Sequence, residues 1–186
     1  MSISPELDHR FRDRAAAEGL LDVAYDLVDS PIGWLFVAVT DRGLCRIEFD
    51  PVPDRDAEEL ARTHGVRILR AARPVEPARR QLGEYFEGDR TVFELPIDLR
   101  GDAPFRRKVL AELARVPYGN VTTYGTLAAQ AGRPRAARAV GTIMNRNPVP
   151  IVLPCHRVVG STGSLVGYGG GLERKEQLLR MEGAIS

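Results

Sequence analysis

The stretch N-P-V-P-I-V-L-P-C-H-R-V-V-G (147–160) separates two kinds of structure in the C-terminal part of this chain. Pro148 and Pro150 exclude a regular helix at its start, because proline lacks the backbone N–H and restricts the residue before it. An apolar run then leads to Pro154-Cys155-His156-Arg157. An imidazole and a guanidinium are neighbours that lower the pKa of a cysteine and favour the nucleophilic thiolate. We therefore interpret this tetrapeptide as a candidate site of covalent chemistry.

Two short helices are expected just before this stretch, after a longer helix at 104–116. The first is capped by Thr122 or Thr123 and ends near Gly132, and the second spans 134–145. Two short helices joined by a tight turn are typical of a helix-turn-helix. Its second helix carries cations that we expect to face solvent, namely Arg135, Arg138 and Arg146.

The formal net charge of +1 conceals an asymmetry. Residues 1–100 contain 14 arginines against 20 acidic residues, whereas residues 101–186 contain 12 basic residues against 5 acidic ones. Such a basic half favours a polyanion as partner, and a solvated arginine-rich surface without function is the alternative. Between Phe105 and Arg157 one acid, Glu112, accompanies nine basic residues: Arg106, Arg107, Lys108, Arg115, Arg133, Arg135, Arg138, Arg146 and Arg157.

A glycine-rich loop and a helix follow the cysteine segment. The loop at 160–171 holds six glycines, which let backbone groups come close to a ligand. It lacks the residue order of a phosphate-binding loop, so binding of a nucleoside triphosphate is disfavoured. An amphipathic helix at 172–182 closes the chain.

The N-terminal half predicts an antiparallel meander of three strands within 22–50, where turns separate runs of alternating apolar residues. Cys45 lies on the apolar phase of the third strand, which favours a buried structural thiol. The other expected elements are a helix or loosely attached extension at 5–18, helices at 54–64 and 77–86, and a strand at 92–99.

The expected fold class is α+β, with an N-terminal antiparallel sheet with helices and a mostly helical C-terminal domain. A boundary is expected at 100–102, where the charge balance changes sign. This gives an N-terminal extension at 1–21, a structural domain at 22–100 and, at 101–186, a basic domain that holds the helix-turn-helix and the candidate reactive cysteine.

Composition excludes several classes of protein. Hydrophobic content of 44% and charged content of 27% are ordinary for a soluble globular protein. No apolar run approaches the roughly 20 residues that span a bilayer, and the first residues lack the pattern of a secretory signal. We expect a cytoplasmic protein whose two cysteines are free thiols. No motif has the spacing of a metal site.

The stretch at 147–160, preceded by P-Y-G-N-V-T-T-Y (117–124) and R-A-A-R-A-V-G (135–141), resembles the O6-alkylguanine-DNA alkyltransferases, or methylated-DNA–protein-cysteine methyltransferases. The segments G-Y-G-G-G-L-E-R-K (167–175) and L-L-R-M-E-G (178–183) extend this resemblance. Over 22–100 it is weaker and rests mainly on two short segments, D-S-P-I-G (29–33) and G-L-C-R-I-E-F (43–49).

The resemblance implies a ribonuclease-H-like N-terminal domain and DNA repair by direct reversal of damage. A methyl or other alkyl group would pass once and irreversibly from O6 of guanine, or O4 of thymine, to Cys155, with no cofactor. His156 would act as general base through a bridging water, oriented by Glu182. Asn147 would hold the turn between the helix-turn-helix and the active-site loop.

The resemblance also implies how DNA is bound. The target nucleotide must leave the duplex before the thiol can reach it. Arg138 would fill the vacated space, and Tyr124 would help rotate the nucleotide and donate to guanine N3. The helix at 134–145 would dock in the minor groove of double-stranded DNA. The other pocket residues would be Pro150, Val158 through its carbonyl, Tyr168, Gly169 and Gly170. The protein would be a monomer in solution, located with the nucleoid, with cooperative assembly on DNA left open.

Some positions depart from the family pattern. Arg106 stands where glutamine is common and Leu110 where tryptophan is common, and the extra charge of Arg106 could strengthen DNA binding. The zinc module fused to some relatives is absent. Two alternatives remain: an alkyltransferase-like protein that only binds lesions, against which Cys155 argues, and a cysteine hydrolase, which would leave the basic helix-turn-helix unexplained.

Overall fold

Three consecutive strands form the meander that the sequence predicts. The computed structural model describes residues 5–186, and in it β1 (Val23–Val28), β2 (Leu35–Thr40) and β3 (Gly43–Phe49) pair antiparallel in that order. A fourth strand, β4 (Ile68–Arg70), pairs with β1 in parallel. The sheet is therefore mixed, with order β3-β2-β1-β4: the predicted antiparallel meander is present, and a parallel strand extends it at one edge. The sequence analysis missed β4 because three residues are too short for a recognisable alternation.

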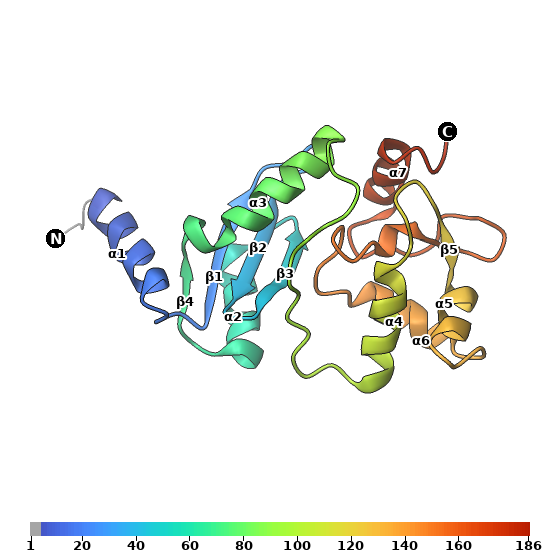
Figure 1. Cartoon of the computed structure of the whole chain (residues 1–186), viewed down its shortest axis with the longest axis horizontal. Helices are drawn as coiled ribbons and strands as arrows, with labels where there is room; N and C mark the ends of the chain where they lie inside the picture. The colour runs from blue at the N-terminus through green and yellow to red at the C-terminus, as the bar shows by residue number, and fades with distance from the viewer. Residues whose placement is uncertain (1–4) are drawn as a thin grey trace. The chain divides into compact units, whose positions relative to one another are not determined.

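Two helices cover the two faces of this sheet. Phe36 and Ala38 of β2 and Cys45 of β3 belong to one buried cluster with Leu60 of α2 (Pro53–His64). The alternate residues face α3 (Ala72–Glu87), which crosses the other face (Figure 1). The predicted burial of Cys45 is confirmed, and its thiol donates to the carbonyl of Ala38 at 3.3 Å.

The predicted elements at 77–86 and 92–99 need correction. Helix α3 begins at Ala72, five residues before Pro77, so that Pro77 lies inside the helix rather than at its start. Residues 92–99 form no strand but a single bridge between Ile97 and Leu44. Because Pro96 has no N–H to donate, the ladder cannot extend past this point.

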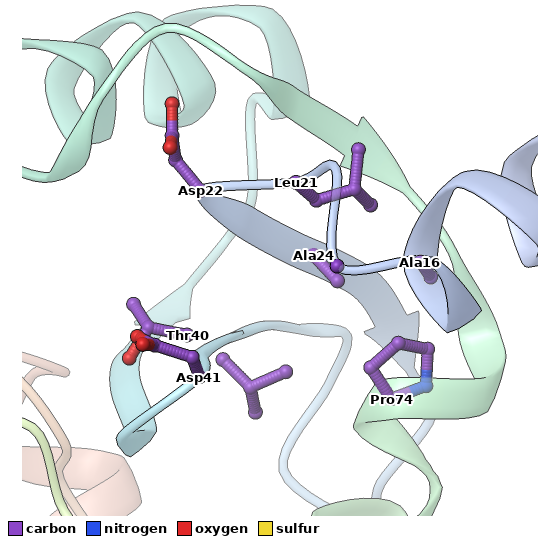
Figure 2. A pocket seen from close by; sticks show the side chains of 9 residues that line it. Ala16, Leu21, Asp22, Ala24, Thr40, Asp41 and Pro74 are labelled. Atoms are coloured by element: carbon purple, nitrogen blue, oxygen red, sulfur yellow. The ribbon is translucent and has the colours of Figure 1, made fainter.

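Helix α1 (Pro5–Ala17) lies within the predicted extension and packs against α3. A small cavity of about 140 Å³ lies between α1, the sheet and the start of α3. Ala16 and Pro74 lie at one end of it, and Thr40 and Asp41 at the other (Figure 2). None of the residues predicted to form the site lines this cavity.

The chain divides into two compact units, the first ending at Asp98 and the second beginning at Leu99. The second unit is mostly helical, as predicted. Helices α4, α5 and α6 pack against one another, and β5 pairs in parallel with β6. Its elements are α4 (Pro104–Ala114), β5 (Thr122–Thr123), α5 (Tyr124–Gln130), α6 (Ala137–Asn145), the 3₁₀-helix η1 (Cys155–Arg157), β6 (Val158–Val159) and α7 (Leu172–Met181).

The predicted helix-turn-helix is present as α5 and α6. The side chain of Thr123 accepts from the N–H of Thr126 at 3.1 Å, which caps α5 as expected. Helix α6 begins at Ala137 rather than at Pro134, because the N–H of Ala136 bonds to the carbonyl of Arg133 and closes a separate turn first. No helix over residues 5–186 has the length and apolar character required to cross a membrane.

Two glycine substitutions test this packing. In Gly43→Ala the new Cβ would lie 2.2 Å from the carbonyl oxygen of Pro96, at a φ of 131°, so we expect a loss of about 2 kcal/mol or more in unfolding free energy. Gly83→Ala lies inside α3 with no atom within 4 Å, so we expect a gain of about 0.5–1 kcal/mol. Urea unfolding measures both, and equal effects would contradict the packing of β3 against Pro96.

Candidate active site

The predicted acceptor thiol lies in a buried turn held by one amide. Asn147 Nδ2 donates to the carbonyl of Leu153 at 2.7 Å and to Cys155 Sγ at 3.1 Å. Its Oδ1 accepts from the N–H of Val149 at 3.2 Å. Ile151, between these contacts, has a φ of 73°, which is uncommon for a β-branched residue. The amide of Asn147 thus connects the end of the helix-turn-helix to the sulfur atom.

A buried carboxylate organises the two residues after the cysteine. Glu182 Oε1 lies 2.8 Å from His156 Nε2. Arg157 donates to both carboxylate oxygens of Glu182 at 2.9 Å, and also to the carbonyl of Val116 at 2.6 Å. All three side chains are buried. A guanidinium that bonds in two places is the strongest partner for such a carboxylate. The structure therefore brings Glu182 to His156, as the resemblance implies.

The same geometry corrects one expectation about the thiol. The side chains of His156 and Arg157 both point to Glu182. Arg157 therefore pairs with the carboxylate and does not lower the pKa of the thiol, contrary to what the sequence had suggested. Burial raises the pKa of the Cys155 thiol to about 11, opposed first by the hydrogen bond from Asn147 and then by the charge of Lys175. Burial also lowers the pKa of His156 below its ordinary value, against the opposing effect of Glu182. The resting site therefore holds a neutral thiol and a neutral imidazole at pH 7.

Lys175 is a residue that the sequence analysis missed. Its ammonium is buried in α7 and donates to the carbonyls of Val158 at 2.6 Å and Val166 at 2.9 Å. Burial lowers its pKa to about 8, and the negative charge of Cys155 in its thiolate form opposes that shift. The available signal was its position on the apolar face of the last helix, three residues before the buried Leu178.

Tyr124 lies beside the glycine-rich loop. Its hydroxyl donates to the carbonyl of Val166 at 3.1 Å, and Gly141 of α6 approaches its ring. Burial raises the pKa of Tyr124, and the negative charge of Cys155 in its thiolate form raises it further. The hydroxyl must leave Val166 before it can donate to a base.

The other predicted pocket residues occupy the same unit. The carbonyl of Val158 already accepts from Lys175, so one lone pair remains for a ligand. Pro150 and Gly170 are buried, Tyr168 is half-buried and Gly169 is exposed. Over residues 5–186 the structure contains no cluster of three or more His, Cys, Asp or Glu side chains suited to a metal ion. Cys45 and Cys155 are both free thiols, as predicted.

The nine predicted cations fall into distinct groups. Arg157 is buried against Glu182, Arg115 pairs with Glu112 at 2.7 Å, and Arg106 is half-buried beside Asp102. The others are exposed, as expected for Arg135, Arg138 and Arg146, although Arg135 precedes α6 rather than lying in it. The exposed group consists of Arg107, Lys108, Arg133, Arg135, Arg138 and Arg146.

A helix-turn-helix with exposed arginines beside a buried thiol defines a DNA-binding protein with a candidate reactive cysteine. Two family models match this chain: the ribonuclease-like domain of 6-O-methylguanine DNA methyltransferase over residues 23–99, and the DNA-binding domain of the same family over residues 104–184. The chain therefore belongs to the 6-O-methylguanine DNA methyltransferase family.

Individual relatives agree with the family models. A methylated-DNA–protein-cysteine methyltransferase of Mycolicibacterium paratuberculosis is 46% identical over 86% of this chain and 92% of its own length. A methylated-DNA–protein-cysteine methyltransferase of Salmonella typhimurium is 41% identical over 89% of this chain and 99% of its own length. The crystal structure of Mycobacterium tuberculosis O6-methylguanine methyltransferase superposes with a TM-score of 0.72 at 39% identity, covering 87% of this chain and 93% of that one. A complex of the Mycobacterium tuberculosis protein OGT with DNA gives a TM-score of 0.73 at 40% identity, with the same coverage of both chains.

Removal of the Glu182 charge tests the buried cluster. In Glu182→Gln the guanidinium of Arg157 stays buried without its counter-charge, so we expect a loss of about 3 kcal/mol or more in unfolding free energy. The control is Glu176→Gln, which breaks an exposed pair with Arg180 and should cost less than about 0.5 kcal/mol. Chemical unfolding compares them, and a small loss in Glu182→Gln would contradict the role of this carboxylate.

Lys175 predicts a dependence of stability on pH. Because its folded pKa of about 8 lies below the ordinary value of 10.5, the unfolded chain binds more protons between these two values. We therefore consider the unfolding free energy of the native protein minus that of Lys175→Met. This difference should be constant below pH 8 and should rise as pH increases from 8 towards 10.5. Urea unfolding across this range measures the difference, and a flat difference would exclude the depressed pKa.

Proposed function

We propose that this protein repairs DNA by transferring a methyl or other alkyl group from O6 of guanine to the sulfur of Cys155. The observation that carries the proposal is the buried thiol held by Asn147 in the same unit as an exposed, arginine-bearing helix-turn-helix. The family match supports the class of reaction. O4 of thymine, whose alkyl group is bonded in the same way, is proposed as a second target.

The hydrogen bonds favour one route for the thiol proton. Glu182 accepts from Arg157, so it stays ionised and can accept from His156 Nε2–H. The free lone pair of the neutral imidazole is then on Nδ1, which is buried and has no hydrogen-bond partner among residues 5–186. We infer that Nδ1 takes the Cys155 proton through a bridging water, with Glu182 stabilising the imidazolium.

The transfer itself is a single displacement. The thiolate sulfur bonds to the alkyl carbon as the bond from that carbon to O6 breaks, and the electron pair passes into the guanine ring. The proton lost by the thiol is balanced by one gained on guanine, which leaves as the ordinary base. Tyr124 would donate to N3 and reduce the developing charge. The product is a thioether, from which a second nucleophile could remove the alkyl group only by displacing a thiolate, a poor leaving group, so each molecule reacts once.

The pocket for the flipped base would be built from the glycine-rich loop and the cysteine segment. Pro150 would line it, and the carbonyls of Cys155 and Val158 would accept from the exocyclic amine of guanine. On the loop, Tyr168 and the N–H of Gly169 would meet O6, with Gly170 beside them. Glycine allows this backbone approach because it has no side chain to exclude the base.

The proposed docking uses α6 in the minor groove of double-stranded DNA. Arg138 is exposed on this helix and would fill the space that the flipped nucleotide leaves. In this arrangement residues 101–186 bind DNA and accept the alkyl group, residues 22–100 form a structural domain, and residues 5–21 belong to the predicted extension at 1–21, whose first four residues lie outside the described part of the chain. We propose that the protein acts as a monomer, in the cytoplasm and associated with the nucleoid.

Mass spectrometry tests the reaction directly. After incubation with a duplex containing O6-methylguanine, we expect one methyl group in place of one hydrogen, located on the peptide with Cys155. Cys155→Ser should remain unmodified, and Cys45→Ser should react as the native protein does, because Cys45 is a buried structural thiol. An unmodified native protein, or a methyl group elsewhere, would overturn the proposed function.

The docking proposal predicts how binding responds to salt and to competition. Arg135→Ala should reduce the salt dependence of duplex binding by about one counterion, whereas Arg180→Ala, which removes a cation paired with Glu176 on α7, should not change it. Netropsin, which occupies the minor groove of A·T-rich duplexes, should compete with the protein. Binding measured by fluorescence anisotropy that is insensitive to netropsin would contradict minor-groove docking.

A further inference from the structure

The first turn of α4 contacts both ends of helix α6. The guanidinium of Arg133, in the turn before α6, lies 4.6 Å from the ring centre of Phe105. At the other end, Arg106 Nη2 donates to the carbonyl oxygen of Arg146 at 2.5 Å. Arg146 is the C-cap of α6, and its carbonyl belongs to the last turn, where carbonyls lack partners within the helix. A cation is favourable there because the helix dipole is negative at this end.

Arg106 is not available as a solvent-exposed cation. Its side chain is 24% exposed, and Nε lies 3.0 Å from Asp102 Oδ1. This N–H is not aimed at the carboxylate, so the pair is electrostatic rather than a hydrogen bond. The first turn of a helix is also an unfavourable place for a cation by itself. From the sequence, Arg106 was expected to supply extra positive charge for DNA binding. In the structure its guanidinium instead contacts Asp102 and the carbonyl of Arg146.

A short path connects Arg106 to the sulfur atom. The residue that follows the anchored carbonyl is Asn147, whose Nδ2 donates to Cys155 Sγ at 3.1 Å. A peptide unit is planar, so fixing the Arg146 carbonyl restricts the orientation of the backbone at Asn147. The hydrogen bond from Asn147 is also the largest influence that lowers the pKa of the buried thiol.

We propose that Arg106 is a positioning residue for the acceptor thiol: it anchors the carboxyl end of α6 and thereby the amide of Asn147 that donates to Cys155. The inference rests on the proposed function of Cys155. It assigns Arg106 to the reaction itself and not to the affinity for DNA.

The test measures methyl transfer to Cys155 from the free base O6-methylguanine, which involves no DNA, by mass spectrometry over long time courses. Arg106→Met should lower the rate about tenfold, the effect of losing a charge-assisted hydrogen bond. It should also move the midpoint of the pH–rate profile to higher pH, because the thiol loses part of its stabilising donor. Arg106→Lys keeps a cationic donor and should recover most of the rate.

A neighbouring cation supplies the control. Arg107→Met removes the same charge from an exposed position on the same helix, and should weaken duplex binding while leaving the free-base rate and its pH midpoint unchanged. In an Asn147→Ala background, Arg106→Met should change the rate by less than about twofold, because its effect passes through Asn147. If Arg106→Met does not fold, as judged by circular dichroism, the same cycle is run with Arg106→Gln, whose shorter neutral donor should lower the rate about threefold.

Each outcome decides between the two proposals. The positioning role is overturned if Arg106→Met, or Arg106→Gln where it replaces that variant, reacts with the free base at the native rate. It is also overturned if the substitution lowers the rate equally in the native and the Asn147→Ala backgrounds. In both cases a native protein that still acquires its methyl group at Cys155 leaves the proposed function intact. A native protein that acquires none from duplex or free base overturns the proposed function instead.

Discussion

The site depends on the burial of one carboxylate. Glu182 lies one residue beyond α7, yet it accepts from both Arg157 and His156 of the cysteine segment. The carboxylate of Glu182 and the guanidinium of Arg157 would each be costly to bury alone, and their pairing offsets that cost only when all the hydrogen bonds are made. The carboxylate therefore fixes the end of the chain to η1 and sets the tautomer of the imidazole in the same step.

Burial has opposite consequences for the structure and for the chemistry of the thiol. A buried cysteine stays neutral and unreactive towards solvent electrophiles, which suits a group that can react only once. The same burial raises the pKa of Cys155 to about 11, so reaction at neutral pH requires a base that removes the thiol proton. Asn147 and Lys175 oppose this rise in pKa but do not cancel it. The remaining requirement, a base that takes the thiol proton, would be met by His156 through the bridging water proposed above.

The basic surface and the reactive segment are parts of one packed unit. Helix α6 carries the exposed Arg138, the exposed Arg135 and Arg146 flank it, and its carboxyl end leads directly into the turn that holds the thiol. Contacts from the first turn of α4 hold both ends of this helix. The proposed DNA-binding surface and the proposed acceptor thiol are thus related by packing within one unit, which would favour accurate placement of a flipped base.

The sequence by itself determined the meander, the helix-turn-helix, the exposed arginines in and beside α6 and the proposed acceptor, because periodicity, turn residues and a rare Cys-His-Arg segment are local signals. It could not show β4 or the early start of α3, since a short parallel strand and a proline inside a helix are stabilised by distant contacts. The contacts of Arg157, Lys175 and Arg106 were decided only by the tertiary structure. The partner of a charged side chain depends on which carboxylates and carbonyls the fold places within about 3 Å of it, and sequence spacing does not encode that distance.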